Sequence, residues 1–185
     1  MIECDVIIKN FYNPNESVYD VLTIHSRQVA DLAVLLAQRL IDAGQPVDIE
    51  FVEEAALLHD IGIIRTDAAG ICCYGSEPYL RHGVIGREML ESMGLFRHAL
   101  VCERHTGAGL SLQDIIDGNL PLPHRDLLPV SVEEKLVCYA DKFFSKTHLG
   151  EPPKPIERVR AQLARFGQGT INRFEQMENQ FGLPI

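Results

Sequence analysis

The sequence has few cysteines, and their arrangement excludes two kinds of stabilised fold. The five residues are Cys4, Cys72, Cys73, Cys102 and Cys138. An odd number without any Cys-x-x-Cys pair argues against a disulfide framework and against a structural zinc site. The thiols are therefore expected to be structural or incidental rather than reactive.

Basic charge and long apolar runs are also scarce. The chain has 17 Lys and Arg residues against 26 Asp and Glu, which gives a net charge of −9 and a pI near 5.2. Proteins that bind nucleic acid polymers gain affinity from basic residues that neutralise phosphates, so no such partner is expected. Apolar runs fall short of the roughly 18–20 residues that cross a bilayer, and the first residues lack the basic and apolar parts of a signal peptide. We therefore expect a cytoplasmic protein without a membrane partner.

What is present is typical of a globular domain. The chain has 185 residues, of which 46% are hydrophobic and 23% charged. This length suits one domain with its own core, and this composition argues against disorder and fibrous repeats.

Helical signals dominate the pattern of apolar residues. They recur at intervals of three and four from Ser17 to Ala43, which predicts one long amphipathic helix that ends before Gly44. Further helices are expected at residues 48–62, 78–93, 96–104, 111–117, 156–166 and 170–181, with loops at 71–77 and 120–130. Ser131 and Glu134 have the spacing of a capping box and predict another helix start. Strand-like alternation is confined to residues 5–8.

These signals predict an all-α fold, a single compact helical bundle. We expect residues 1–16 to form an N-terminal extension and residues 17–150 the helical core. The C-terminal helices at 151–185 are expected to pack on the same domain.

One pair of polar residues follows a strongly apolar helix. His59 and Asp60 come directly after the run Ala55–Leu58 and lie about 100° apart around the helix axis, so both can reach one ion at the helix end. An isolated His-Asp pair is more often a capped helix end with a hydrogen-bonded histidine. This pair is not isolated, because other segments supply further imidazole and carboxylate groups of the type that first-row divalent ions bind in helical bundles. The complete candidate set is His25, His59, Asp60, His82, His105 and Asp141.

The order and context of three of these stretches are specific. They are Ile24-His25-Ser26, Leu57-Leu58-His59-Asp60-Ile61-Gly62 and Tyr139-Ala140-Asp141-Lys142. Together they resemble the HD superfamily of metal-dependent phosphohydrolases, with His59–Gly62 as its HDIG core, over roughly residues 17–146. The resemblance implies an HD-domain-like bundle in which His25, His59, Asp60 and Asp141 hold an ion.

His82 and His105 stand where members of this superfamily with two metal ions carry two additional histidines. The resemblance thus implies a binuclear centre with Asp60 as the bridging catalytic residue. The alternative is a single ion, with His82 and His105 contacting substrate or other ligands. The remaining histidines, His98, His124 and His148, match no motif and are expected on the surface or in loops.

Two departures from the superfamily bear on the substrate. Some phosphodiesterases of this kind have a lysine directly after the HDIG glycine, where this chain has Ile63. We expect Arg65 and Lys142 to contact phosphate instead. The Gly-Tyr-Pro signature of the cyclic-di-guanylate subgroup is absent, so that substrate is not expected.

The resemblance implies phosphoester hydrolysis by a metal-activated hydroxide, with a nucleotide or another small phosphorylated metabolite as the substrate. The ligand types accept Fe, Mn, Co, Ni or Zn. Two other functions stay open: a di-iron oxygenase, because myo-inositol oxygenase has the same fold and ligands, and a non-catalytic metal or nucleotide sensor. The intact ligand set argues against the sensor, while the substrate and the oligomeric state are left open.

Overall fold

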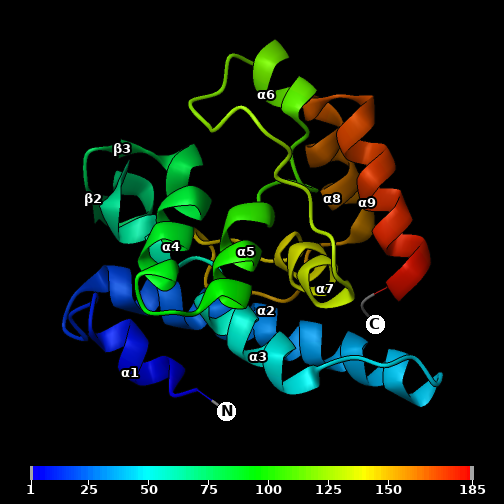
Figure 1. Ribbon diagram of the computed structural model, residues 1–185, viewed down its shortest axis with the longest axis horizontal. Helices are drawn as coiled ribbons and strands as arrows, with labels where there is room; N and C mark the ends of the chain where they lie inside the picture. Colours follow the sequence, from blue (N-terminus) through cyan, green and yellow to red (C-terminus); the bar gives the residue numbers. More distant parts are fainter. Residues whose placement is uncertain (1, 184–185) are drawn as a thin grey trace.

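The computed structural model describes residues 2–183, and helices make up most of this range (Figure 1). The outermost residues of the two predicted terminal segments, 1, 184 and 185, lie outside it. The α-helices are α1 (Cys4–Lys9), α2 (Ser17–Asp42), α3 (Ile49–Leu58), α4 (His82–Glu91), α5 (Phe96–Arg104), α6 (Leu112–Asp117), α7 (Val132–Asp141), α8 (Ile156–Leu163) and α9 (Gln168–Phe181). The predicted helical fold class is confirmed. No helix within residues 2–183 has the length and apolar character needed to span a membrane.

The long helix α2 supports both parts of the hydrophobic core. Its apolar residues face inward at the helical period, as predicted, and it ends at a left-handed Gly44 with φ +81°. The amides of Gly44 and Gln45 donate to the carbonyls of Ile41 and Leu40, which is a Schellman ending. α2 therefore ends where its sequence predicted.

Two core clusters meet along α2. One contains the second half of α2 together with residues of α3, α7, α8 and α9, and the other joins the start of α2 to α1, α4 and α5. His25 lies on α2 between Leu22, which belongs to the second cluster, and Val29, which belongs to the first. The candidate ligand on this helix is thus held between the two halves of the core.

The N-terminal segment differs from the expectation for residues 5–8. These residues are part of helix α1, and Ile7, Ile8 and Tyr12 are buried in the core. The Tyr12 hydroxyl donates to the Ile61 carbonyl (2.7 Å) and accepts from the Ile64 amide (3.2 Å). The strand prediction was wrong because four alternating residues fit one helical turn equally well. The segment holds the chain directly after Asp60 in place.

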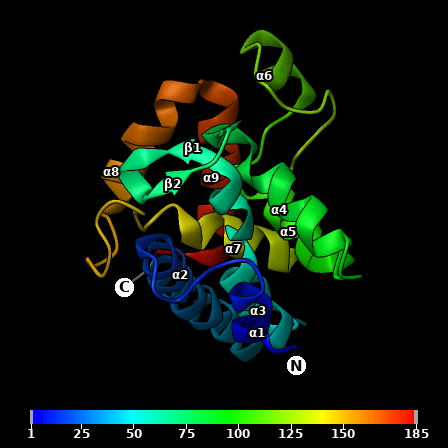
Figure 2. The ribbon, with the colours of Figure 1, turned by 90° about the vertical axis from the view of Figure 1, so that its left-hand side faces the viewer.

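A small sheet interrupts the helices after Asp60. Its strands are β1 (Thr66–Ala68), β2 (Cys73–Tyr74) and β3 (Glu77–Pro78), in the order β2-β1-β3, with β1 antiparallel to β2 and parallel to β3. Figure 2 shows it facing the viewer, with α9 behind it. Pro78 is extended in β3 and a 3₁₀ turn follows, so α4 begins at His82 and not at residue 78. Such short strands have no readable period, and residues 71–77 were therefore predicted as a loop.

The predicted capping box at Ser131 and Glu134 forms only one of its two hydrogen bonds. The Glu134 amide donates to Ser131 Oγ (3.2 Å) as expected, but the Glu134 carboxylate accepts from the Val130 amide instead of the Ser131 amide. The complete reciprocal box lies at Ser111 and Asp114, at the start of α6.

Candidate metal centre

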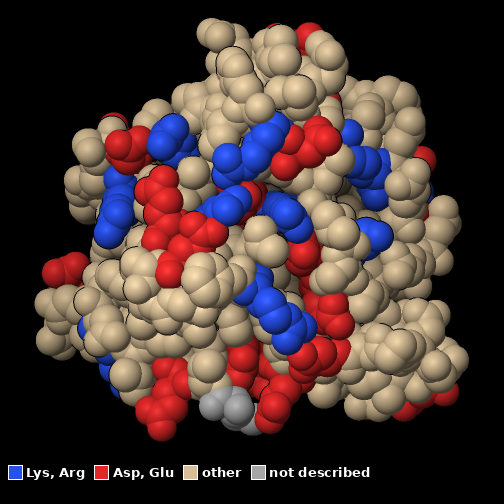
Figure 3. All heavy atoms as spheres, in the orientation of Figure 1, with Lys and Arg blue, Asp and Glu red and all other residues tan. Residues whose placement is uncertain are grey.

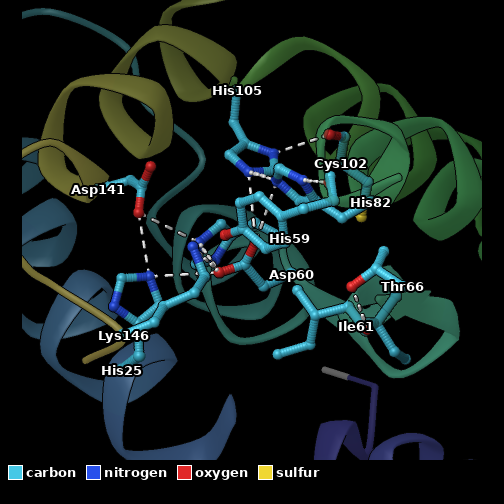
Figure 4. Close-up of polar contacts among 12 residues, drawn as sticks. His25, His59, Asp60, Ile61, Thr66, His82, Cys102, His105, Asp141 and Lys146 are labelled. Carbon is cyan, nitrogen blue, oxygen red and sulfur yellow. Dashed lines mark hydrogen bonds and ion pairs between the residues drawn. The ribbon is translucent and has the colours of Figure 1, made fainter. Parts of the chain in front are cut away.

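Three helices bring four of the predicted ligands together. His25 projects from α2, His59 and Asp60 follow the end of α3, and Asp141 is the last residue of α7 (Figure 4). His25 Nε2 lies 3.3 Å from Asp60 Oδ2 and 3.0 Å from Asp141 Oδ1, and His59 Nε2 lies 3.1 Å from Asp60 Oδ2. One atom from each residue lies within 4.8 Å of the others, which is close enough for a single ion to bind all four.

A second group shares Asp60 with the first. His82 begins α4 and His105 follows α5, and their Nε2 atoms each lie 3.4 Å from Asp60 Oδ1. The two Nε2 atoms are 3.0 Å apart. One carboxylate oxygen of Asp60 thus faces the first group, and the other faces His82 and His105. This division is the arrangement that a carboxylate between two ions requires.

The local chain sets the orientation of three of these imidazoles. The Nδ1 atoms of His59, His82 and His105 lie 2.7–2.8 Å from the backbone carbonyl oxygens of Ala56, Tyr79 and Cys102. A carbonyl can only accept, so each Nδ1 carries the proton, and in the neutral ring Nε2 keeps its lone pair. In the neutral rings, the lone pairs of His82 and His105 face each other across 3.0 Å, an arrangement that a cation stabilises.

The charges in the centre favour ligand-ready protonation states at most of these groups. The exception is His59, where burial lowers the pKa but the charge of Asp60 raises it to about 9, so its Nε2 proton must leave before an ion binds. Burial lowers the pKa of His82 to about 3 and also lowers that of His105, so both rings are neutral. Burial alone would raise the pKa of Asp60, but the charges of His59 and Lys146 hold it well below its usual range. Burial opposes ionisation of Asp141 as well, and the neighbouring lysines outweigh it.

The buried donor atoms fit divalent metal ions. Asp60 is fully buried, and within residues 2–183 neither of its oxygens, nor His59 Nε2, has a hydrogen bond of good geometry. Leaving a buried carboxylate without such partners is costly unless cations lie against it. A set of imidazole nitrogens and carboxylate oxygens suits first-row divalent ions.

The two predicted phosphate-binding residues lie in different places. Lys142 Nζ lies 2.6 Å from Asp141 Oδ2 and donates to the His105 carbonyl (3.1 Å), so Lys142 is at the centre. Arg65 ends the 3₁₀ turn Ile61–Arg65 with an exposed side chain, which makes no hydrogen bond or ion pair with residues 2–183. The structure does not bring Arg65 to the ligands.

Sequence reasoning missed Lys146. Its Nζ atom lies 2.6 Å from Asp60 Oδ2, and its side chain is 13% exposed. Tyr79, which stacks on His82 with ring centroids 4.7 Å apart, lies beside it, and Lys146 Nζ is 6.0 Å from the Tyr79 ring. Lys146 lies in the loop after α7, where helical periodicity gives no direction to a side chain. The one sequence feature that could have indicated a place near the ligands is its position five residues after Asp141.

The histidines outside the motifs lie away from the centre. His124 and His148 are exposed, as expected. His98 is not on the surface, because it lies buried on α5 with Nε2 3.1 Å from Glu54 Oε2. The five cysteines are free, and burial raises the pKa of Cys4, Cys73 and Cys138 to about 11, which agrees with unreactive thiols.

Comparison with known proteins identifies one family. The model of the HD domain family matches residues 22–145, a segment that contains all six candidate ligands. An uncharacterized protein of Methanocaldococcus jannaschii is 34% identical over 160 residues, which cover 86% of this chain and 83% of that protein. A search of solved structures found no significant match.

Two further relatives have a name that states an activity. The tRNA (cytidine(56)-2'-O)-methyltransferases of Thermoplasma volcanium and Picrophilus torridus are 34% and 31% identical over 127 and 144 residues. These matches cover 68% and 77% of this chain but only 32% and 36% of the two enzymes. The chain thus corresponds to about a third of each methyltransferase.

Proposed function

The chain belongs to the HD domain family, and from this premise we propose that it is a metal-dependent phosphohydrolase acting on a nucleotide or another small phosphorylated metabolite. The observation that carries the proposal is the division of Asp60. Its Oδ2 atom faces His25 and His59, and its Oδ1 atom faces His82 and His105. A phosphohydrolase with two ions needs such a shared carboxylate.

The donor set assigns the residues to two ions. His25, His59, Asp60 and Asp141 would hold one, and Asp60, His82 and His105 the other. Fe, Mn, Co, Ni and Zn all suit these ligands. When bound, such ions lower the pKa of water toward neutrality and offset negative charge on phosphoryl oxygens.

The chain's own residues position the substrate. The ammonium groups of Lys142 and Lys146 lie beside Asp141 and Asp60 and line a cavity that opens next to the ligands. They can donate hydrogen bonds to the phosphate and hold it toward the centre. The hydrogen bonds at Nδ1 of His59, His82 and His105 keep the rings fixed while the substrate binds.

The charge distribution supports a small substrate rather than a nucleic acid polymer. The net charge is −9, and on the face drawn in Figure 3 basic side chains lie among acidic ones. The relatives named as tRNA methyltransferases share only about a third of their length with this chain. We therefore do not carry their activity over to it.

The test is release of inorganic phosphate or a nucleoside monophosphate under strict exclusion of oxygen. The protein is reconstituted with Mn²⁺ or Zn²⁺ and given a panel of nucleotides and small phosphate esters. We expect turnover without oxygen, its loss in Asp60→Asn, and unchanged turnover in the control His124→Gln, whose side chain is exposed.

Two other outcomes contradict the hydrolase. Oxygen consumption supported only by iron, together with a mixed-valent paramagnetic resonance signal and no phosphate release, would identify an oxygenase. Tight binding of metal and nucleotide without any turnover would identify a sensor.

A further inference from the structure

A cavity of about 350 Å³ adjoins the metal centre and has two chemically different parts. Its charged residues are Asp141, Lys142, Lys146 and Lys154. Most of its remaining wall is apolar and includes Leu110, Leu120, Phe144, Val159, Leu163 and Phe166. The volume suits one small ligand.

The charged part of this cavity is built for an anion. Three lysines face Asp141 and Asp60, the ion-pair partner of Lys146, which leaves a formal surplus of one positive charge in a chain whose net charge is −9. Lys142 and Lys146 pair with Asp141 and Asp60. Lys154 forms no ion pair within 4.0 Å in the described part of the chain, and its Nζ donates to Gln162 Oε1 at 3.5 Å. Burial lowers the pKa of Lys154, so a bound anion would stabilise its charged form.

The apolar part offers little to a polar molecule. Apart from the charged residues, its polar side chains are Thr106, Gln162 and Thr170. A sugar or a nucleoside has many hydroxyl and amino groups, and each one that is buried without a partner costs binding free energy. An aliphatic or aromatic group instead gains affinity from contact with these walls.

Much of this wall comes from the end of the chain. Lys154, Val159, Leu163 and Phe166 all follow residue 145, where the match to the HD domain family ends. Lys154 lies two residues before α8, Val159 and Leu163 are on α8, and Phe166 ends the 3₁₀ turn Ala164–Phe166. Phe166 is 71% exposed although it lines the cavity, so it lies where the cavity meets solvent.

We propose that the preferred substrate is the phosphate ester of a largely apolar alcohol or phenol. Its phosphate lies at Lys142, Lys146 and Lys154, and its organic group packs against the apolar wall, with Phe166 as a specificity residue. This inference rests on the proposed phosphohydrolase function, because it places the reacting phosphate at the metal centre.

Non-hydrolysable ligands test the inference apart from turnover. Methyl-, propyl- and hexylphosphonate are titrated into the manganese-reconstituted protein by calorimetry. We expect the affinity to rise about fourfold for each methylene that is buried against the wall. In parallel, kcat/KM for hexyl phosphate should exceed that for ribose 5-phosphate, which has the same primary alcohol type of leaving group, by at least about tenfold.

Matched variants assign the two parts of the cavity. Lys154→Gln should weaken all three phosphonates by a similar factor, whereas Lys135→Gln, a half-buried lysine outside this cavity, should not. Phe166→Ser should flatten the dependence on chain length, while Phe96→Ser, which changes another exposed phenylalanine outside the cavity, should leave it unchanged. Both phenylalanines are exposed, so neither substitution removes a core contact.

The outcomes separate this inference from the proposed function. Equal phosphonate affinities, together with equal hydrolysis of ribose 5-phosphate and hexyl phosphate, overturn the apolar substrate and leave the hydrolase intact. Chain-length dependence that is lost in Phe166→Ser, without hydrolysis of any ester, supports the ligand class and overturns the hydrolase.

Discussion

Removing a ligand on one side of Asp60, and separately the carboxylate of Asp60 itself, tests whether the centre holds two ions. His82→Gln removes a ligand that faces only Oδ1, and Asp60→Asn removes the carboxylate that both groups share. We expect two ions per chain in the natural protein, one in His82→Gln and none in Asp60→Asn at the same free metal concentration. Asparagine has a single carbonyl oxygen and no charge, so it cannot serve both groups.

The size of the effect follows from binding linkage. At a free metal concentration 100 times the Kd, each ion stabilises the folded chain by about 2.7 kcal/mol. For a chain of this length 1 kcal/mol raises Tm by about 2–4 °C, so each ion should raise Tm by about 5–11 °C. His82→Gln should keep about half of the total metal-induced shift.

The assay combines elemental analysis of dialysed protein with thermal unfolding with and without Mn²⁺. His124→Gln, an exposed histidine, is the control. Because Asp60→Asn leaves the ammonium of Lys146 without its partner, a cost of about 3–5 kcal/mol, the double variant with Lys146→Met is measured beside it. Equal metal content in His82→Gln and the natural protein, or full occupancy in Asp60→Asn, would refute the shared carboxylate.

Two further predictions concern stability. A Cβ atom at Gly62 would lie 2.1 Å from the His82 carbonyl oxygen, so Gly62→Ala should lower the free energy of unfolding, measured by urea titration, by about 1–3 kcal/mol. The control Gly70→Ala should change it little, because a Cβ atom there meets nothing within 4 Å. Equal effects of the two substitutions would contradict this packing. Burial lowers the pKa of His98 from 6.5; the charges of Glu54 and Asp48 oppose this shift, and that of Arg97 adds to it. The contribution of the neutral His98 side chain to the free energy of unfolding is therefore complete above pH 6.5 and is lost as pH falls below it. The difference in Tm between the natural protein and His98→Asn should therefore shrink between pH 7 and pH 5, and a constant difference would show that His98 does not titrate in this way.

The sequence predicted helices well where many residues share one period. α2 and α5 ended within a residue of the predicted bounds, because buried apolar residues define both helices locally and Gly44 ends α2. β1 to β3 could not be predicted, since strands of two or three residues depend on partners elsewhere in the chain. α1 was missed for a related reason: its buried residues pack in a core cluster with residues about 50 positions away, and Cys4 Sγ contacts the Glu54 carbonyl.

In the candidate centre, too, the residues with informative sequence neighbours were predicted, and those placed only by the fold were not. His59 and Asp60 were identified from their neighbours. Four distant residues were added because they supply further imidazole and carboxylate groups, and the resemblance to a known family then gave them roles. Lys146 has no such context, since only the fold places it against a residue 86 positions earlier. Arg65 illustrates the converse, because closeness in sequence to Asp60 did not turn its side chain toward the ligands.

The chain places its candidate metal ligands and much of its cavity wall in separate stretches. The ligands lie between residues 25 and 141, while part of the apolar wall comes from residues 154–170. Substitutions in this C-terminal stretch leave the ligand set unaltered, so related proteins can accumulate them without losing metal. Within one lineage the ligand residues should therefore evolve slowly and the wall quickly, and exchanging residues 154–170 between two relatives should transfer ligand preference while the metal content stays the same.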